Sequence, residues 1–222
     1  MVTKVITDNS SGGDYAGCEC TGIRENTPTT NYGTDTTFES QRYGAGLYFN
    51  GLIKFSGLSN IPANATITSV TLGLYLDVNS LTDTGFQDGL YPVLRNWTEA
   101  GATWGKYDGS NAWTTAGAIG SGDVAASASC QVVIGTGATG YVNFTDGGLI
   151  ADVQAIVSGS ANYGWLLRKD GGGTNDGSYR AFRSDNGADG TRPTLTVVYT
   201  LTAGYERAGN RGVSRGVDRG VN

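Results

Sequence analysis

The sequence predicts an all-β protein: an antiparallel β-sandwich of jelly-roll type with one short helix and an extended C-terminal tail. Three observations indicate this class. Gly accounts for 36 of the 222 residues and charged residues for only 16%, apolar residues alternate with polar ones in two stretches, and turn residues recur between short apolar runs. Because 38% of the residues are hydrophobic, the body of the chain can bury a core.

The two alternating stretches predict the central strands. From Leu47 to Phe55 the odd positions are mostly apolar, and from Val70 to Leu76 the even positions are. A period of two places such residues on one face of a strand, so each strand is expected to offer one face to the core. The polar stretch that begins at Cys20 predicts a surface loop across the sandwich.

The remaining elements follow in chain order. A helix is predicted from Asp146 to Val157, capped by Thr145 or Asp146 and ended by Gly159. Asp77–Gly89 is expected to be a loop. Further strands are expected at Val2–Ile6, at Leu90–Leu94, at Ser129–Ile134 and Gly140–Phe144 as a hairpin, and at Gly164–Lys169, Ser178–Ser184 and Pro193–Leu201. Pro92 indicates that the strand at Leu90–Leu94 is either an edge strand or interrupted.

Several ordered motifs carry a resemblance that spans most of residues 20–201. They are Ile23-Arg24-Glu25-Asn26, Asn31-Tyr32-Gly33, Leu52-Ile53-Lys54-Phe55, Trp97-Thr98-Glu99, Gly164-Trp165-Leu166-Leu167 and Arg192-Pro193-Thr194. Together they resemble the DNRLRE domain family, although Gly22-Ile23-Arg24-Glu25 replaces its fuller signature. The resemblance implies an extracellular jelly-roll-like module, a type that is partly grouped with carbohydrate-binding modules.

Charge excludes some classes of partner. The net charge is −5; residues 205–222 hold four Arg against two acidic residues, which leaves −7 on the body. An acidic body excludes nucleic acid as the main partner. No run reaches the ~20 apolar residues of a membrane span, so no membrane partner is expected. The N-terminal residues Met1–Thr7 lack the apolar region of a signal peptide.

The residues available for chemistry predict that the protein is not an enzyme and needs no cofactor. The sequence has no His, which excludes the usual nucleophilic triads. Gly135-x-Gly137-x-x-Gly140 matches a dinucleotide fingerprint, but a strand follows it where a helix is needed. Of the three cysteines, Cys130 either pairs with Cys18 or Cys20, or all three are reduced; a zinc site is not expected.

Two sets of residues are candidate ligand contacts. The loop Asn96–Gly117 carries Trp97, Trp104, Tyr107 and Trp113, whose rings could stack on the C–H faces of a sugar or else pack beneath the loop. The oxygen-rich turn that contains Asp185 and Asp189 could hold Ca²⁺, or it forms Asx-turns.

The C-terminal tail predicts assembly with other subunits. Residues 1–202 are expected to form the sandwich, and residues 203–222 an Arg-Gly-Val repeat without a fold of its own, because it is Gly-rich and poor in apolar residues. In an extended conformation the repeat places alternate residues on one face, for contact with a capsid, tail or identical subunit. The alternative is that the tail folds back on its own domain. The residues predicted to mediate assembly are Arg207, Arg211, Val213, Arg215, Val217, Arg219 and Val221.

These observations lead to two functional hypotheses. The first is a non-enzymatic structural protein displayed on the surface of a bacteriophage virion, as a capsid decoration or tail accessory attached through its tail. The alternative is a carbohydrate-binding module, extracellular or on a cell surface, that recognises a polysaccharide through the loop tryptophans. The two differ in whether the tryptophans or the tail carry the function.

Overall fold

The computed structural model describes residues 1–6, 17–43, 47–80, 87–135, 137–170 and 175–201. They form one sheet of eleven antiparallel strands, an α-helix and a short 3₁₀-helix, which confirms the all-β sandwich class. The elements are β1 (Val2–Ile6), β2 (Cys18–Arg24), β3 (Thr37–Tyr43), β4 (Tyr48–Phe55), η2 (Ser56–Asn60), β5 (Ala65–Ser80), β6 (Gln87–Pro92), β7 (Cys130–Val133), β8 (Gly140–Phe144), α1 (Gly147–Val157), β9 (Trp165–Asp170), β10 (Asn175–Arg183) and β11 (Thr194–Leu201).

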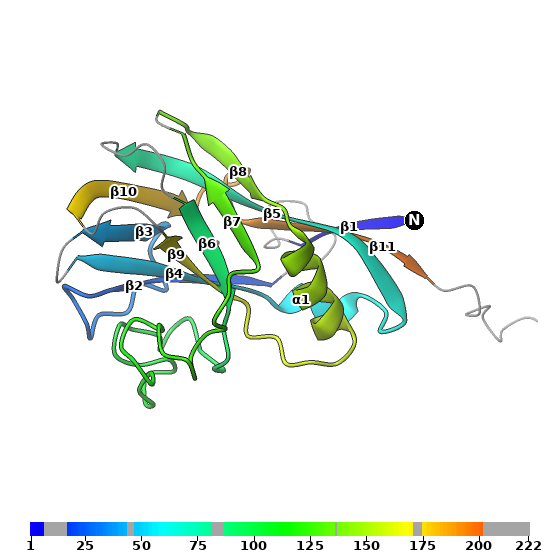
Figure 1. The fold of residues 1–222 in the computed structure, drawn as a ribbon, viewed down its shortest axis with the longest axis horizontal. Helices are drawn as coiled ribbons and strands as arrows, with labels where there is room; N and C mark the ends of the chain where they lie inside the picture. The colour runs from blue at the N-terminus through cyan, green and yellow to red at the C-terminus, as the bar shows by residue number, and fades with distance from the viewer. Residues whose placement is uncertain (7–16, 44–46, 81–86, 136, 171–174, 202–222) are drawn as a thin grey trace, which may run out of the picture.

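The sheet curls into two layers, one centred on β5 and the other on β4 (Figure 1). The strand order is β1-β11-β5-β10-β3-β4-β9-β6-β7, with β2 added to β4 and β8 to β5. Leu72 of β5 pairs with both β11 and β8, which therefore lie on opposite edges of β5. In the same way Leu52 of β4 pairs with both β2 and β9. The step from β10 to β3 connects the two layers.

The main hydrophobic core lies between these layers. The even positions from Val70 to Leu76 are at most 2% exposed, as the alternation predicts. Burying each such side chain stabilises the fold by about 1.5–3 kcal/mol. Other large side chains of this core are Ile6, Phe38, Ile53, Phe55, Leu58, Phe144, Trp165, Phe182 and Leu195.

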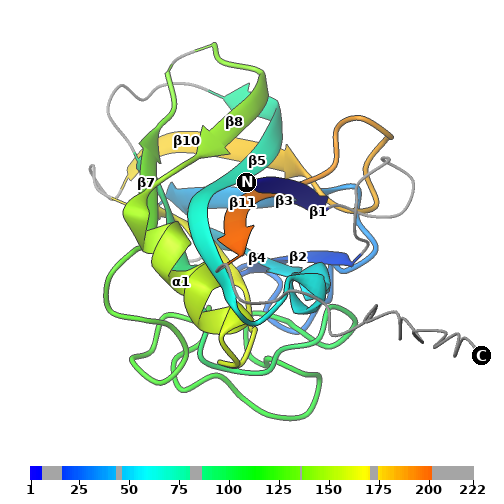
Figure 2. The same ribbon diagram turned by 90° about the vertical axis from the view of Figure 1, so that its right-hand side faces the viewer.

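Helix α1 covers one end of this core (Figure 2). It begins after Asp146, whose carboxylate accepts a hydrogen bond from the Gly148 amide at 3.4 Å, so Asp146 and not Thr145 is the cap. Gly159 follows the helix at φ +111°, as a C-terminal glycine requires. Gln154 holds the helix against β5 by accepting from Ile67 N and donating to Ala65 O. The buried face consists of Leu149, Val153 and Val157.

A second core lies on the outer face of β4 and β9. The long connection between β6 and β7 runs beneath β2 and β4 and covers that face (Figures 1 and 2). Leu52 projects into it and is fully buried. The predicted inward face of β4 is confirmed, because Phe49, Ile53 and Phe55 are at most 9% exposed. The opposite face of β4 is buried as well, because the loop supplies a second apolar layer. The residues of this core are Ile23, Leu52, Tyr91, Val93, Trp97, Ala102, Trp104, Trp113, Ala118, Val124 and Leu166.

Strands β2 and β3 occupy a region that was predicted to be a surface loop. Their polar residues satisfy one another inside the fold: Arg24 of β2 donates to Glu39 of β3 through Nε at 2.9 Å and through Nη2 at 2.6 Å. Glu39 is only 2% exposed. Because the polar side chains pair across strands, they do not produce the apolar alternation by which a strand is recognised.

Three further predictions, one of a loop and two of strands, are corrected. The predicted loop Asp77–Gly89 contributes residues 77–80 to β5 and 87–89 to β6, and Asp83 lies outside the described residues. β6 is flanked by β9 and β7, so it is not an edge strand, and of the two alternatives for Pro92 the interruption holds, because Pro92 is the last residue of β6. β7 and β8 do not form a hairpin, because β7 pairs with β6 and β8 with β5.

A buried ion pair joins β6 to β10. Arg180 Nη1 lies 2.6 Å from Asp88 Oδ2, and the two side chains are 1% and 0% exposed. Ser40 also donates to Asp88. Burial raises the pKa of Asp88 above its ordinary value even though the neighbouring Arg180 lowers it. This pair ties one layer to the other in a region with little water to screen it.

All three cysteines are free and buried, which resolves the alternatives in favour of reduced thiols. Cys18 Sγ and Cys20 Sγ lie 3.4 Å apart on β2. Burial raises the pKa of both thiols above the ordinary value.

Within the described ranges there is no helix with the length and apolar character needed to cross a bilayer.

Candidate functional site

The connection between β6 and β7, which we call the aromatic loop (residues 93–129), has a defined shape without regular strands. One cause is Asp123, a fully buried residue. Its carboxylate accepts hydrogen bonds from Thr114 N at 2.8 Å, Thr115 N at 2.9 Å and Gly120 N at 3.3 Å, and it pairs with Arg95 Nε at 3.4 Å. Although burial alone would raise it, these bonds lower the pKa of Asp123.

Gly117 positions Trp104 within this loop. Its amide donates to Trp104 O at 2.7 Å, and its carbonyl accepts from Asn50 Nδ2 of β4 at 2.9 Å. Gly117 has a φ of +85°, and a Cβ at this position would lie 2.5 Å from Trp104 Cη2. Glycine is therefore required at this position for two reasons: the backbone has a positive φ, and the indole ring leaves no space for a Cβ.

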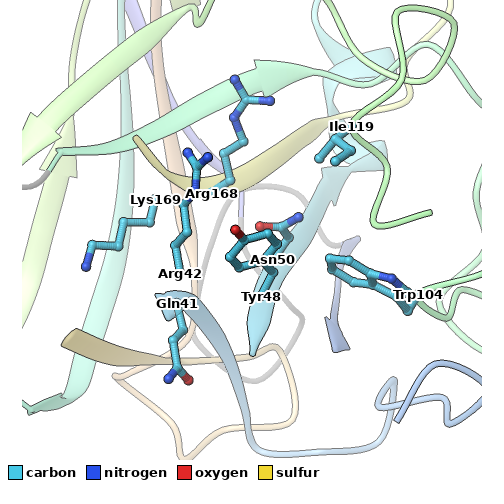
Figure 3. A pocket seen from close by; sticks show the side chains of 8 residues that line it. All are labelled: Gln41, Arg42, Tyr48, Asn50, Trp104, Ile119, Arg168 and Lys169. Carbon is cyan, nitrogen blue, oxygen red and sulfur yellow. The ribbon is translucent and has the colours of Figure 1, made fainter. Parts of the chain in front are cut away.

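A pocket of about 290 Å³ opens where this part of the loop meets the outer face of the sheet (Figure 3). Tyr48 and Asn50 of β4 lie at its centre, with Trp104 on one side and the cationic side chains on the other. The volume lies near the lower end of the range for small-ligand pockets. The lining residues are Gln41, Arg42, Tyr48, Asn50, Trp104, Ile119, Arg168 and Lys169.

The pocket is cationic although the body of the protein is acidic. Arg42, Arg168 and Lys169 line it, and none of its lining residues is Asp or Glu. The Arg168 guanidinium lies 3.7 Å from the centroid of the Tyr91 ring and donates through Nε to Asp170 at 3.1 Å. These two contacts fix the orientation of the planar guanidinium before any ligand arrives, which lowers the entropic cost of binding an anion.

The four aromatic residues predicted as ligand contacts occupy different positions. Trp97 has no exposed surface and donates through Nε1 to Tyr163 O at 2.7 Å. Trp113 is 5% exposed and donates to Thr103 O at 3.0 Å. The half-buried Tyr107 packs on Trp113 with ring centroids 5.5 Å apart. Trp104, at 8% exposure, is the member of this set that lines the pocket.

The two candidate calcium ligands interact with different partners. Asp185 lies against Glu99, whereas the exposed Asp189 pairs with Arg192 at 3.2 Å. The described residues contain no group of three or more acidic, cysteine or histidine side chains that could hold a metal ion. Calcium binding at these positions therefore stays a prediction without a ligand cluster.

The tail residues Arg207, Arg211, Val213, Arg215, Val217, Arg219 and Val221 lie outside the described residues. Assembly through this segment, and the domain boundary at 202, accordingly stay predictions.

Sequence reasoning missed most of the pocket. Arg42 lies in a stretch that was interpreted as a loop, and Arg168 and Lys169 lie 39 and 40 residues beyond the end of the aromatic loop in the sequence. One signal was available: Tyr48 and Asn50 alternate with the inward Phe49, so they had to face the other side of β4.

A model of carbohydrate-binding module family 96 matches residues 19–122, which is slightly less than half of the chain. The match runs from β2 into the aromatic loop and includes six of the eight pocket residues, but not Arg168 or Lys169. It supports the coarser part of the resemblance, a carbohydrate-binding type of β-domain. A search of curated proteins found no match.

Proposed function

We propose that this protein is a non-catalytic carbohydrate-binding module, displayed outside the cell, whose pocket recognises an anionic polysaccharide. The observation that carries the proposal is the meeting of Trp104 and Tyr48 with Arg42, Arg168 and Lys169 in one pocket. The family match supports the carbohydrate as ligand, and the charge of the lining residues supports its anionic character. This function was the alternative reading of the sequence.

The chemistry of a uronate polymer fits these side chains. Each sugar ring presents apolar C–H groups, which pack on the edge or face of an aromatic ring, and a carboxylate, which a guanidinium binds through paired hydrogen bonds. The Asn50 and Gln41 amides can both donate to and accept from hydroxyl groups. A neutral polymer offers the cationic side chains of the pocket no charged hydrogen-bond acceptor.

The proposal is tested with a matched pair of polymers, polygalacturonate and its methyl ester, which differ in charge but share a backbone. Affinity is measured by calorimetry at physiological salt. We expect the acidic polymer to bind and Arg42→Gln to weaken binding roughly 5- to 20-fold, since one charged contact contributes about 1–2 kcal/mol. Arg42 is suitable because it is exposed and is not part of either core.

Lys106→Gln is the control for this variant. Lys106 is also exposed and cationic, and it lies on the aromatic loop but does not line the pocket. If both variants weaken binding equally, the attraction is a general charge effect and the pocket is not the site. Equal affinity for the methyl ester would contradict the anionic specificity.

The virion hypothesis has no observation in its favour among the described residues. Its support was the tail, on which the structure is silent, and an extracellular-type domain serves both readings equally. Deleting residues 207–222 and measuring incorporation into particles or oligomers remains its test.

A further inference from the structure

Three segments from other parts of the chain meet at Glu99, near the start of the aromatic loop. Cys20 N of β2 donates to Glu99 Oε1 at 3.0 Å. The Asn31 side chain donates to Glu99 O at 2.7 Å, and Gly33 packs so closely that a Cβ there would lie 2.6 Å from Glu99 O. Asp185, from the turn between β10 and β11, completes the junction through its contact with the Glu99 carboxyl group.

The same turn is fastened to the Asn31–Gly33 segment. Asn186 Nδ2 donates to Gly33 O at 3.0 Å, and Ser184 Oγ donates to Asp35 O at 2.6 Å. Asp185 therefore sits on a held backbone, and its side chain reaches Glu99 from a fixed position. The two carboxyl groups are brought together by the fold and not by chance contact of mobile side chains.

The Glu99 and Asp185 carboxyl groups lie within hydrogen-bonding reach of each other, and a hydrogen bond between two carboxyl groups requires a proton on one of them. Two ionised carboxylates cannot form such a bond and repel at this range. One oxygen, Asp185 Oδ1, is buried and has no hydrogen-bond partner among the described residues. An ionised carboxylate with a buried, unbonded oxygen is costly, so the geometry favours a singly protonated pair.

The charges around the pair do not neutralise it. Glu19 of β2 faces it and adds negative charge, whereas Lys54 of β4 opposes this effect but already pairs with Glu19 at 2.9 Å. The Cys18 and Cys20 thiols also face Asp185 and have raised pKa values, so they stay neutral. Burial, followed by the charge of Glu99, raises the pKa of Asp185 to about 7.

We propose that Glu99 and Asp185 form a proton-operated latch that holds the aromatic loop against the sheet. With one shared proton the pair joins the loop to the β10–β11 turn; without it, two carboxylates repel across the junction and the loop loosens. Because Trp104 and Ile119 belong to this loop, the pocket is best formed in the latched state. The latch goes beyond the proposed function, and its test requires no ligand.

The sign of the effect follows from proton linkage. In the latched state Asp185 has a raised pKa, and on opening it returns to its ordinary value near 4. The latched state therefore binds more protons than the open state between about pH 4 and 7, so latching is complete at low pH and is lost as pH rises through about 7. Allowing for the partial exposure of the pair, the opening equilibrium should increase roughly 10- to 100-fold from pH 5 to pH 8.

Hydrogen exchange measured by mass spectrometry on the full chain tests this proposal. Protection factors, corrected for the intrinsic pH dependence of exchange, are compared at pH 5 and pH 8 for peptides from residues 96–124 and 184–192. We expect protection to fall by the stated factor in these peptides while β5 peptides stay constant. Unchanged protection in the wild-type protein would overturn the proposal without any variant.

Two variants and one control sharpen the result. Asp185→Asn supplies a permanent donor to Glu99 and should abolish the pH dependence, as should Glu99→Gln from the other side. Asp189→Asn is the control, because it makes the same change on the same turn at an exposed residue. Should Asp189→Asn abolish the pH dependence equally, or both latch variants retain it, Glu99 and Asp185 are not the latch.

Discussion

The strongest single prediction concerns Asp123, the residue around which residues 113–124 of the aromatic loop are folded. Replacing Asp123 with Ala removes the acceptor of three backbone N–H groups and the partner of Arg95. Each unsatisfied buried donor costs about 1–3 kcal/mol, and three donors lose their acceptor. Because water relieves part of this cost, the free energy of unfolding should fall by about 3–5 kcal/mol. For a domain of this size the melting temperature should fall by roughly 6–20 °C.

The assay is thermal unfolding followed by circular dichroism, with exchange protection of residues 113–124 measured in parallel. Asp108→Ala is the matched control. Asp108 also accepts from two backbone amides, Ser110 N and Asn111 N, but it does so in a solvent-accessible turn. We expect a clearly smaller fall for Asp108→Ala. Equal falls in the two variants would refute the argument that the buried position of Asp123 is what makes it essential.

Two further predictions concern the second layer of the fold and the pocket. Arg180→Met leaves Asp88 buried without the cation that it pairs with, and should lower the free energy of unfolding in urea by about 3–5 kcal/mol. Adding Asp88→Asn should restore part of this stability. If the two substitutions instead lower the stability additively, the two side chains do not pair directly. Gly117→Ala should displace Trp104 and weaken polygalacturonate binding, measured by calorimetry, about 10-fold. Gly190→Ala is the control, because Gly190 also has a positive φ, +78°, but open space around it; this variant should leave the affinity unchanged.

The pH dependence of Asp123 differs from that of the latch, which makes the two separable in one titration. The pKa of Asp123 is lowered, so its contribution is complete above the ordinary carboxyl pKa and is lost only as pH falls through the lower folded value. Between pH 5 and pH 8 Asp123 is constant. Loosening of the loop over that interval must therefore come from groups whose pKa values are raised, such as Asp185.

Local patterns were enough to predict β5 and α1 from the sequence. The alternation from Val70 to Leu76 places four apolar side chains on one face, and Asp146 with Gly159 marks both ends of the helix. Pairing between strands was not predictable in this way. β7 and β8 flank a Gly-rich turn and so resemble a hairpin, but each finds its partner in a strand far away in sequence.

The polar strands β2 and β3 show a second limit of local patterns. Arg24, Glu39 and Ser40 look like loop residues when each is considered alone, yet Glu39 and Ser40 are nearly inaccessible because their partners come from other strands. The same cause concealed the cations of the pocket, which are contributed by β3 and β9 and converge only in the folded sheet. Pairs of complementary charges carry no period, so they escape a search for alternation.

The three tryptophans of the aromatic loop cannot be distinguished by sequence, and their indole N–H groups show how the fold separates their roles. Trp97 and Trp113 each donate to a backbone carbonyl inside the protein, at 2.7 and 3.0 Å, which is how a buried indole avoids a desolvation cost. Trp104 lines the pocket, supported from behind by Gly117. All three tryptophans belong to the second core, and the rigidity that Trp97 and Trp113 give the loop holds Trp104 at the pocket. A substitution at Trp97 or Trp113 should therefore reduce binding only by destabilising the loop. Trp104→Phe also changes the pocket lining, so it should reduce binding by more than its effect on the melting temperature explains.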